Sequence, residues 1–424
     1  MPRSSVTLEA VSALSTSPTV DPPLADEVLA GDAEVVDDAV AAIDDETTDW
    51  WPAALPVPWR RPLAAIGWAV QMTAGTVAIG LLLAIVAAIP IANFYALGVL
   101  LDVGACASRG RLRAAFWLWG AAPRLGTILL FTWLTVLPVR LLSSMATDAA
   151  VIAPAADASV ALRIGTLVAA VVAAVHLLLA VARGGRARHF LWPVGNLWWL
   201  LRGRAGADWY RRSSYELAAL LRWLQLPRLW WLGVRGFVGA LAWLVVPTAL
   251  YLAARREDDP RIAITLLAFV PLVHVFCRLP ILQMHFAREG RLKAYLAHRH
   301  ARMTFGYAPW EWTLAIAVLY MLTLPLYLTK IVLPPRDVVW VATIFFVVTI
   351  FPTKLLLGWA YGRSERRRTA GLPRRRWWVR WPARLVMVAV VGAYAFLLFF
   401  TQFISEHGRA ALFEQHAFLL PWPL

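Results

Sequence analysis

The feature that most constrains the fold is a series of long apolar segments. Each segment has about twenty residues with few charges, which is the length an α-helix needs to cross the hydrocarbon core of a bilayer. The chain is 60% hydrophobic, well above the usual share for a soluble domain. The sequence therefore predicts an all-α membrane protein, a polytopic transmembrane helical bundle of eight or nine spans. The eight clear segments are 66–89, 126–147, 160–182, 228–254, 262–287, 310–333, 337–361 and 382–404.

A ninth segment, 91–107 ("IANFYALGVLLDVGACA"), is shorter than the others. Positive residues favour the cytoplasmic side of a membrane. Arginines precede the first span at 60 and 61 and also follow the short segment at 109, 111 and 113. Both groups lie inside only if 91–107 crosses back as the second arm of a hairpin, so we favour nine crossings. The alternative is one long tilted helix over 66–101 with eight crossings.

The arginine-rich connections set the expected orientation. Segments 183–212, 288–302 and 363–384 are strongly basic, so the positive-inside rule places all three in the cytoplasm. The C-terminal segment 405–424 then lies outside. A net charge of +15 is explained by topology and by contact with anionic headgroups of the lipid bilayer. No nucleic-acid partner is predicted.

The charge also divides the chain into two parts. Residues 1–59 hold twelve acidic residues and one arginine, and we expect a disordered acidic tail there. Residues 60–424 form the predicted transmembrane domain. Within it, "ASRGRLRAAF" at 107–116 is echoed by "AREGRLKAYL" at 287–296. Either a three-span unit is repeated over 66–147 and 228–333, or the two basic stretches match by chance.

Three basic segments are predicted to lie at the membrane surface as interfacial amphipathic helices: 209–226, 291–303 and 374–381. The last one reads "RRRWWVRW", which pairs arginine with tryptophan, a composition typical of the headgroup region. The residues predicted to contact anionic lipid are Arg374, Arg375, Arg376, Trp377, Trp378 and Arg380.

Polar residues inside the apolar segments are the candidate functional positions, because hydrocarbon disfavours charge by about 2.5–3.5 kcal/mol on insertion scales. The candidate intramembrane polar site consists of Asn93, Asp102, His176, His274 and Arg278. Long or terminal polar side chains also reach the interface by snorkelling. The two histidines belong either to a proton or ion relay or to neutral hydrogen bonds with a neighbouring helix.

Asn93 and Asn196 are the only two asparagines, and each lies three residues after a proline. Proline tends to end a preceding helix, and an asparagine side chain often accepts a hydrogen bond from the first turn of the next one. The sequence predicts that both residues cap helix starts. Asn93 would then mark the turn of the outer hairpin.

Sequence motifs of known enzymes, such as G-x-S-x-G, H-E-x-x-H or a P-loop, are absent from the chain. Cys106 and Cys277 are the only cysteines, too few for a disulfide framework or a four-cysteine metal site. We predict no catalytic residue, no metal and no cofactor. The leading hypothesis is a non-enzymatic protein with a structural, assembly or partner-binding role, with a cytosolic or membrane protein as partner.

Two other functions stay open on the sequence. One is a transporter or permease with a site near the bilayer midplane, based on the repeat, the Pro-Asn break and the two histidines. The other is a membrane-embedded lipid-modifying enzyme, which requires polar residues such as Asp102, His189 and Glu216 to converge at one interface.

One stretch resembles a known family. "PIANFYALG" at 90–98 followed by "SRGRLR" at 108–113 is similar to the hallmark of a family of bacterial multi-pass membrane proteins built on a domain of unknown function. Val99 stands where the family pattern has tyrosine. Further segments resemble an uncharacterised bacterial subgroup with the same opening: "RHFLWP" at 188–193, "GFVGALAWLVVP" at 236–247, "FPTKLLLGWAYGR" at 351–363 and "FEQHAFLLPWP" at 413–423. The resemblance therefore covers most of residues 66–424 and implies a multi-pass protein of the bacterial inner membrane. It assigns no activity and no site residue.

Overall fold

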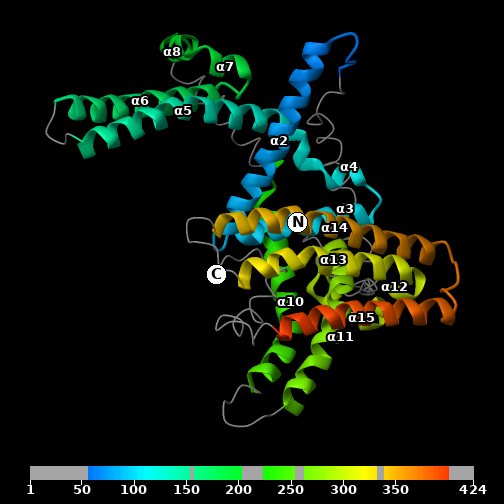
Figure 1. Cartoon of the computed structure of the whole chain (residues 1–424). Coiled ribbons are helices and arrows are strands. Elements are labelled where there is room, and N and C mark those ends of the chain that lie inside the picture. Colours follow the sequence, from blue (N-terminus) through cyan, green and yellow to red (C-terminus); the bar gives the residue numbers. More distant parts are fainter. Residues whose placement is uncertain (1–55, 153–156, 203–222, 254–261, 332–338, 401–424) are drawn as a thin grey trace, which may run out of the picture. The chain divides into compact units, whose positions relative to one another are not determined.

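The computed structural model describes residues 56–152, 157–202, 223–253, 262–331 and 339–400. These residues are helical or irregular, without a β-strand, and eight of their helices are long and apolar enough to cross a membrane. The predicted class, an all-α polytopic membrane protein, is confirmed (Figure 1). In chain order the helices are α2 (Pro62–Ala88), α3 (Asn93–Ser108), α4 (Leu112–Ala115), η2 (Trp117–Ala121), α5 (Ala122–Ile152), α6 (Asp157–Ala182), α7 (Ala187–Leu191), α8 (Pro193–Arg202), α10 (Leu226–Ala253), α11 (Ile262–Glu289), η3 (Leu292–Leu296), α12 (His298–Tyr307), α13 (Pro309–Ile331), α14 (Val339–Thr369) and α15 (Trp377–Phe400).

A break separates α2 from α3. Pro90 has no backbone N–H to continue a helix, and Ile91 has a φ of 70°, a conformation that a β-branched residue rarely adopts. The indole Nε1 of Trp230 in α10 donates a hydrogen bond of 2.8 Å to the carbonyl of Ile91. The alternative of one continuous helix over 66–101 is therefore wrong. Because α3 has only 16 residues, its crossing of the membrane stays a prediction.

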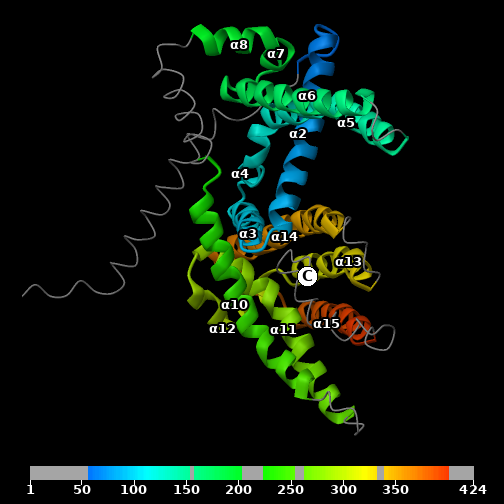
Figure 2. The same cartoon turned by 90° about the vertical axis from the view of Figure 1, so that its left-hand side faces the viewer.

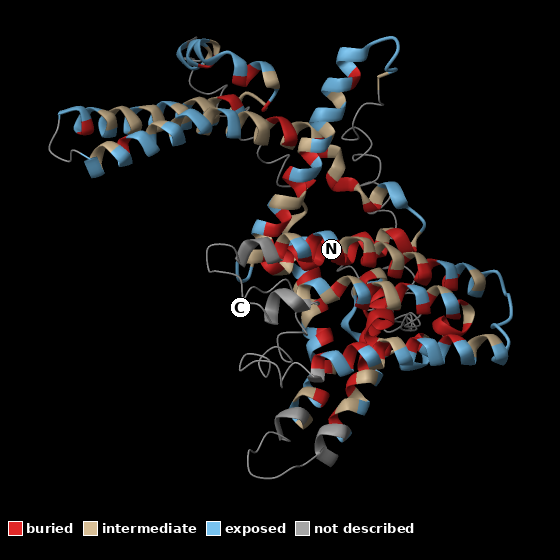
Figure 3. Ribbon diagram, viewed as in Figure 1, coloured by how far each residue is buried: buried red, intermediate tan, exposed pale blue. Residues whose placement is uncertain are grey.

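Helix α3 forms the centre of the packed core. Fourteen of its 16 residues are buried, and it contacts α2, α10, α11 and α14 (Figure 3). Gly98 faces α10, whereas Gly104 faces Met284 of α11 and the backbone of α14. Small residues at such crossings allow two membrane helices to approach closely and gain van der Waals contact.

Polar side chains join the helices of the C-terminal half, where α13 contacts α14 and α15 (Figure 2). The indole Nε1 of Trp312 in α13 donates to Ser364 Oγ in α14 at 3.0 Å. The hydroxyl of Tyr320 in α13 donates to the carbonyl of Phe276 in α11 at 2.8 Å. These bonds satisfy groups that lipid cannot satisfy.

Helices α5 and α6 pack on each other and expose most of their remaining surface (Figure 3). Large apolar side chains such as Leu167, Val172 and Leu178 are more than half exposed on α6. A continuous exposed apolar surface of this kind is stable against lipid tails and unstable in water. It supports the membrane assignment independently of helix length.

The two echoed basic stretches have similar backbones. Gly110 after α3 and Gly290 after α11 have φ values of 79° and 69°, and each precedes a short helix. They also touch, because the Arg109 guanidinium donates to the carbonyl of Arg288 at 3.1 Å. The duplication of a three-span unit stays a prediction.

Several predicted features lie outside the described residues. They are the acidic tail up to residue 55, the C-terminal segment after residue 400, and most of the interfacial segment 209–226.

Candidate functional site

A turn of two glycines after α6 shapes the site. Gly184 and Gly185 have φ values of 106° and 63°, which L side chains rarely adopt. Their amides donate to the carbonyls of Val181 and Ala180 at 2.9 and 3.0 Å, the two bonds of a Schellman helix end. The chain then turns directly into α7. This sharp turn gathers the arginines of "ARGGRAR" on both sides of the two glycines.

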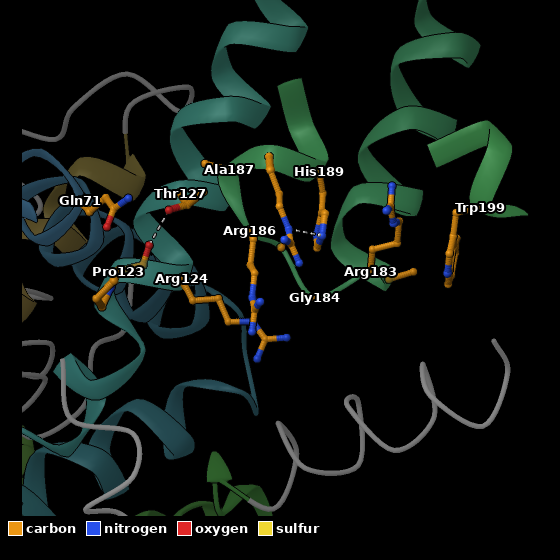
Figure 4. A pocket seen from close by; sticks show the side chains of 13 residues that line it. Gln71, Pro123, Arg124, Thr127, Arg183, Gly184, Arg186, Ala187, His189 and Trp199 are labelled. Carbon is orange, nitrogen blue, oxygen red and sulfur yellow. Dashed lines mark hydrogen bonds between the residues drawn. The ribbon is translucent and has the colours of Figure 1, made fainter. Parts of the chain in front are cut away.

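The turn forms one wall of an open pocket of about 1000 Å³. Other walls come from Gln71 in α2, Arg124 and Thr127 in α5, and Trp199 in α8. Figure 4 shows Arg124 and Arg186 extending toward the same side of the pocket. The arginines that line the pocket are Arg124, Arg183, Arg186 and Arg188. None of the described lining residues is acidic, so the described lining of the pocket is basic.

Asn196 of α8 holds this wall together. Its amide nitrogen donates to the carbonyl of His189 at 2.7 Å and lies 3.2 Å from His176 Nδ1. Its amide oxygen accepts from Arg183 at 2.7 Å. The side chain is fully buried and links α6, α7 and α8. The prediction that Asn196 caps a helix is wrong, because α8 begins at Pro193 and the amide bonds to other helices.

His189 of α7 is a buried residue in the pocket wall. The Nε of Arg188 donates to His189 Nε2 at 3.3 Å, so the neutral ring carries its hydrogen on Nδ1. That Nδ1 is buried and has no hydrogen-bond partner among the described residues. Burial lowers the pKa of His189, and the charges of Arg183, Arg188 and Arg186 lower it further. The wall of the pocket therefore contains a buried neutral donor that lacks an acceptor among the described residues.

The four arginines that line this pocket favour an anion. Arginine presents a planar set of donors that matches the oxygens of phosphate and carboxylate. The free Nδ1–H of His189 requires an acceptor, and an unmet buried donor costs about 1–3 kcal/mol. The chemistry of the pocket is that of binding an oxyanion.

The predicted candidate residues do not form one site. Asn93 is buried at the start of α3, and its Oδ1 has no hydrogen-bond partner among the described residues. The prediction that its side chain caps α3 is wrong, because no side-chain cap bond is present there.

Asp102 is buried in α3 and pairs with Arg228 of α10 at 3.3 Å. The sulfur of Cys106 lies 3.9 Å from the same carboxylate. This residue therefore links α3 to α10. Sequence reasoning missed Arg228, which lies 126 positions away along the chain.

His176 lies near the end of α6. Its Nε2 is 3.0 Å from the carbonyl of Phe190 in α7, and its Nδ1 faces Asn196. His274 is exposed on the surface of α11, and Arg278 is partly exposed one turn further on. The three residues lie in separate environments, and only His176 is linked, through Asn196, to residues that line the arginine pocket.

The stretch 374–381 is exposed at the start of α15. Trp377 and Trp378 are at least half exposed, and Arg376 lies over the Trp378 ring at 4.8 Å. The backbone amide of Arg375 donates to the carbonyl of Gly306 at 3.0 Å and fixes the segment to α12. Lipid contact by Arg374, Arg375, Arg376, Trp377, Trp378 and Arg380 stays a prediction.

No group of His, Cys, Asp and Glu among the described residues is arranged to hold a metal ion. Both cysteines are free. Of the three residues proposed for lipid chemistry, Asp102 pairs with α10, His189 lines the arginine pocket and Glu216 lies outside the described residues. Comparison with protein-family models, curated proteins and solved structures finds no match to this chain.

Proposed function

We propose that this multi-pass membrane protein binds a phosphate-bearing anion in the arginine pocket, and that the anion is the headgroup of an acidic lipid. One observation carries the proposal: four arginines line the pocket, and none of its described lining residues is acidic. Phosphate oxygens are strong acceptors that pair with arginine in a bidentate manner. We favour a lipid as the source of this anion because the pocket lies at the start of α5 and the end of α6, two long apolar helices, beside α7.

The role that we propose is non-enzymatic. The pocket has arginines, one histidine and one glutamine as its polar side chains, together with Thr127. The Thr127 hydroxyl already donates to the carbonyl of Pro123 at 2.7 Å. This set binds and orients an anion, and it offers no activated nucleophile. We therefore assign the protein to lipid-dependent assembly or partner binding.

The arginine distribution supports a cytoplasmic position for this pocket. Arg183, Arg186 and Arg188 flank the α6–α7 turn, and Arg124 begins α5. Under the positive-inside rule, the start of α5 and the end of α6 lie on the cytoplasmic side of a bacterial inner membrane. The cytoplasmic leaflet carries anionic lipid, which attracts basic residues by about 1 kcal/mol each near the surface.

Transport across the membrane receives no comparable support. Asn93, His176 and His274 do not meet at one place: the first is buried at the start of α3, the second bonds to α7 and α8, and the third is exposed.

Native mass spectrometry of the purified protein in detergent tests the proposal. Added phosphatidylglycerol should bind at one saturable position, and phosphatidylcholine should not compete for it. Arg186→Ala should weaken binding about tenfold, because a hydrogen bond to a charged group is worth about 1.5–3 kcal/mol. Arg299→Ala is the matched control, since Arg299 is an equally exposed arginine on α12.

Two outcomes would overturn the proposal. One is that Arg186→Ala and Arg299→Ala bind phosphatidylglycerol equally well. The other is that inorganic pyrophosphate binds the pocket while phosphatidylglycerol does not, which would identify a soluble phosphate compound as the ligand.

A further inference from the structure

A second polar cluster lies where α11, α12 and α14 meet. The hydroxyl of Tyr361 in α14 lies 2.8 Å from His285 Nδ1 and 3.0 Å from His300 Nε2. The two imidazole rings stack with their centroids 4.0 Å apart. Tyr361 and His285 are buried, and His300 is partly buried. One hydroxyl thus bridges two histidines from two different helices.

The hydrogen atoms of this bridge have only one consistent arrangement when both rings are neutral and Glu289 is ionised. His285 Nε2 lies 3.2 Å from Glu289 Oε1, so it carries a hydrogen and donates to this carboxylate. His285 Nδ1 must then accept from the Tyr361 hydroxyl. The tyrosine oxygen in turn accepts from His300 Nε2–H. The result is a directed chain from His300 through Tyr361 and His285 to Glu289.

A second carboxylate, that of Glu365, lies beside His300 at the other end of this hydrogen-bond chain. Glu365 of α14 is buried, and its Oε2 accepts from Arg368 at 2.7 Å. Its Oε1 is buried without a hydrogen bond to any described residue and lies 3.6 Å from His300 Nε2. A small movement of His300 would complete this bond. The structure therefore holds an unmet acceptor next to a group that gains a charge when it takes up a proton.

Charges of both signs surround the cluster. Burial lowers the pKa of His300, while Glu365 raises it, and Arg368 and Arg288 lower it. Two protonated rings in a stack at 4.0 Å would repel each other strongly in this environment. The titratable and charged groups that face the two histidines are Glu289 and Arg288 from α11, Tyr361, Glu365 and Arg368 from α14, and Arg291, which faces Glu289.

We propose that His285, Tyr361 and His300 form a binding site for a single proton, which the bridge passes between His300 and Glu289. The proton binds at His300 Nδ1, which makes no hydrogen bond to another described residue. His300 Nε2 then gives its proton to the tyrosine oxygen, Tyr361 gives its own to His285 Nδ1, and His285 Nε2 gives its own to the Glu289 carboxylate. Each group gains one proton and loses one, except Glu289, which ends protonated.

This site is separate from the proposed lipid function. The residues come from α11, α12 and α14, and none of them lines the arginine pocket. A proton on His300 adds a positive charge that attracts Glu365 Oε1. It therefore changes how α12 is held against α14.

Nuclear magnetic resonance of the full chain in detergent tests the proposal. The Cζ signal of Tyr361, labelled with carbon-13 and assigned with Tyr361→Phe, should shift with pH at the same midpoint as the ring signals of His285 and His300. Tyr295 is the matched control, because it is equally buried but donates to the carbonyl of Gly236 at 2.9 Å. Its signal should not change over the same range.

Proton counting gives a second readout that does not depend on any variant. Integrated over the titration of the two ring signals and of the Glu289 carboxyl signal, the bridge and Glu289 together should take up one proton between pH 8 and pH 5. Two independent protonations in that range would overturn the proposal. So would a Tyr361 signal that ignores pH while the histidines titrate.

Discussion

Gly98 and Gly233 bring the backbones of α3 and α10 into direct contact. A Cβ atom placed at Gly98 would lie 1.8 Å from the carbonyl oxygen of Leu229, and one at Gly233 would lie 1.8 Å from that of Phe94. No side chain fits between the helices at this crossing. The Trp230–Ile91 bond and the Asp102–Arg228 pair lie on the same interface.

Substitution of Gly98 by alanine should therefore separate α3 from α10. Overpacking of a close contact costs about 1–3 kcal/mol, and the clashing atoms here are backbone, which cannot move aside as a side chain can. We expect a lower midpoint of thermal unfolding in detergent. Gly80→Ala in α2 is the control, because a Cβ at Gly80 meets nothing within 4 Å. Equal midpoints for the two variants would contradict this account of the interface.

The Asp102–Arg228 pair should stabilise the same interface. Arg228→Ala leaves the Asp102 carboxylate buried without this cation, and the cost is reduced because the Arg228 side chain is 45% exposed. We expect the free energy of unfolding to fall by about 1 kcal/mol, the upper end of the range for an exposed ion pair. Asp102→Asn combined with Arg228→Ala should recover part of the loss, since no charge is then left unpaired. A double-mutant cycle of thermal unfolding measures this coupling, and additive effects would show that the pair contributes nothing.

Anion binding in the arginine pocket should strengthen as the pH falls. The pKa of His189 is lowered by burial and by the three neighbouring arginines, so the ring is neutral at pH 7. A bound anion offsets this positive charge and raises the pKa of His189, so that the complex takes up a proton. By linkage, affinity then rises as the pH falls through the raised pKa of His189 in the complex.

The measurement is the dissociation constant for phosphatidylglycerol at several pH values between 5 and 8. In His189→Gln, which keeps a polar group but does not titrate, the pH dependence should disappear. If the dissociation constant of His189→Gln still depends on pH, the proton taken up on binding belongs to another group.

His300 should make folding stability depend on pH. Its pKa is lowered in the folded state, with burial as the largest cause, so the unfolded chain binds more protons below pH 6.5. This contribution to stability is complete above about pH 6.5 and is lost as the pH falls through the folded-state pKa. The midpoint of thermal unfolding should fall between pH 7.5 and pH 5.5 by more in the wild type than in His300→Gln. An equal fall of the unfolding midpoint in the wild type and in His300→Gln would contradict the lowered pKa of His300.

The sequence indicated the basic segment of the arginine pocket but not the pocket itself. Arg183, Arg186 and Arg188 stand in a stretch that was predicted to be cytoplasmic on charge alone. Arg124 joins them from α5, nearly 60 positions earlier, because the α6 hairpin returns to the start of α5. The sequence predicted Asn196 only as a helix cap, because the spacing of nearby residues carries no information about the three helices that its amide connects.

The His285–Tyr361–His300 bridge had no signal in the sequence. His300 and Tyr361 are 61 positions apart, and neither lies in a motif. Only the packing of α12 against α11 and α14 brings their side chains together. A periodic or spacing argument cannot detect such a contact, because it compares residues within one element.

The sequence by itself determined the helical membrane class, the positions of the eight long apolar helices and the break before Asn93. These are local properties: about twenty apolar residues span a bilayer in any context, and Pro90 lacks the backbone N–H that would continue the preceding helix. The tertiary structure decided that the short helix α3 is the buried centre, that Asp102 pairs with α10, and which polar groups lack partners. Those outcomes depend on which helices touch, and close contact at glycines such as Gly98 and Gly233 is fixed by three-dimensional shape.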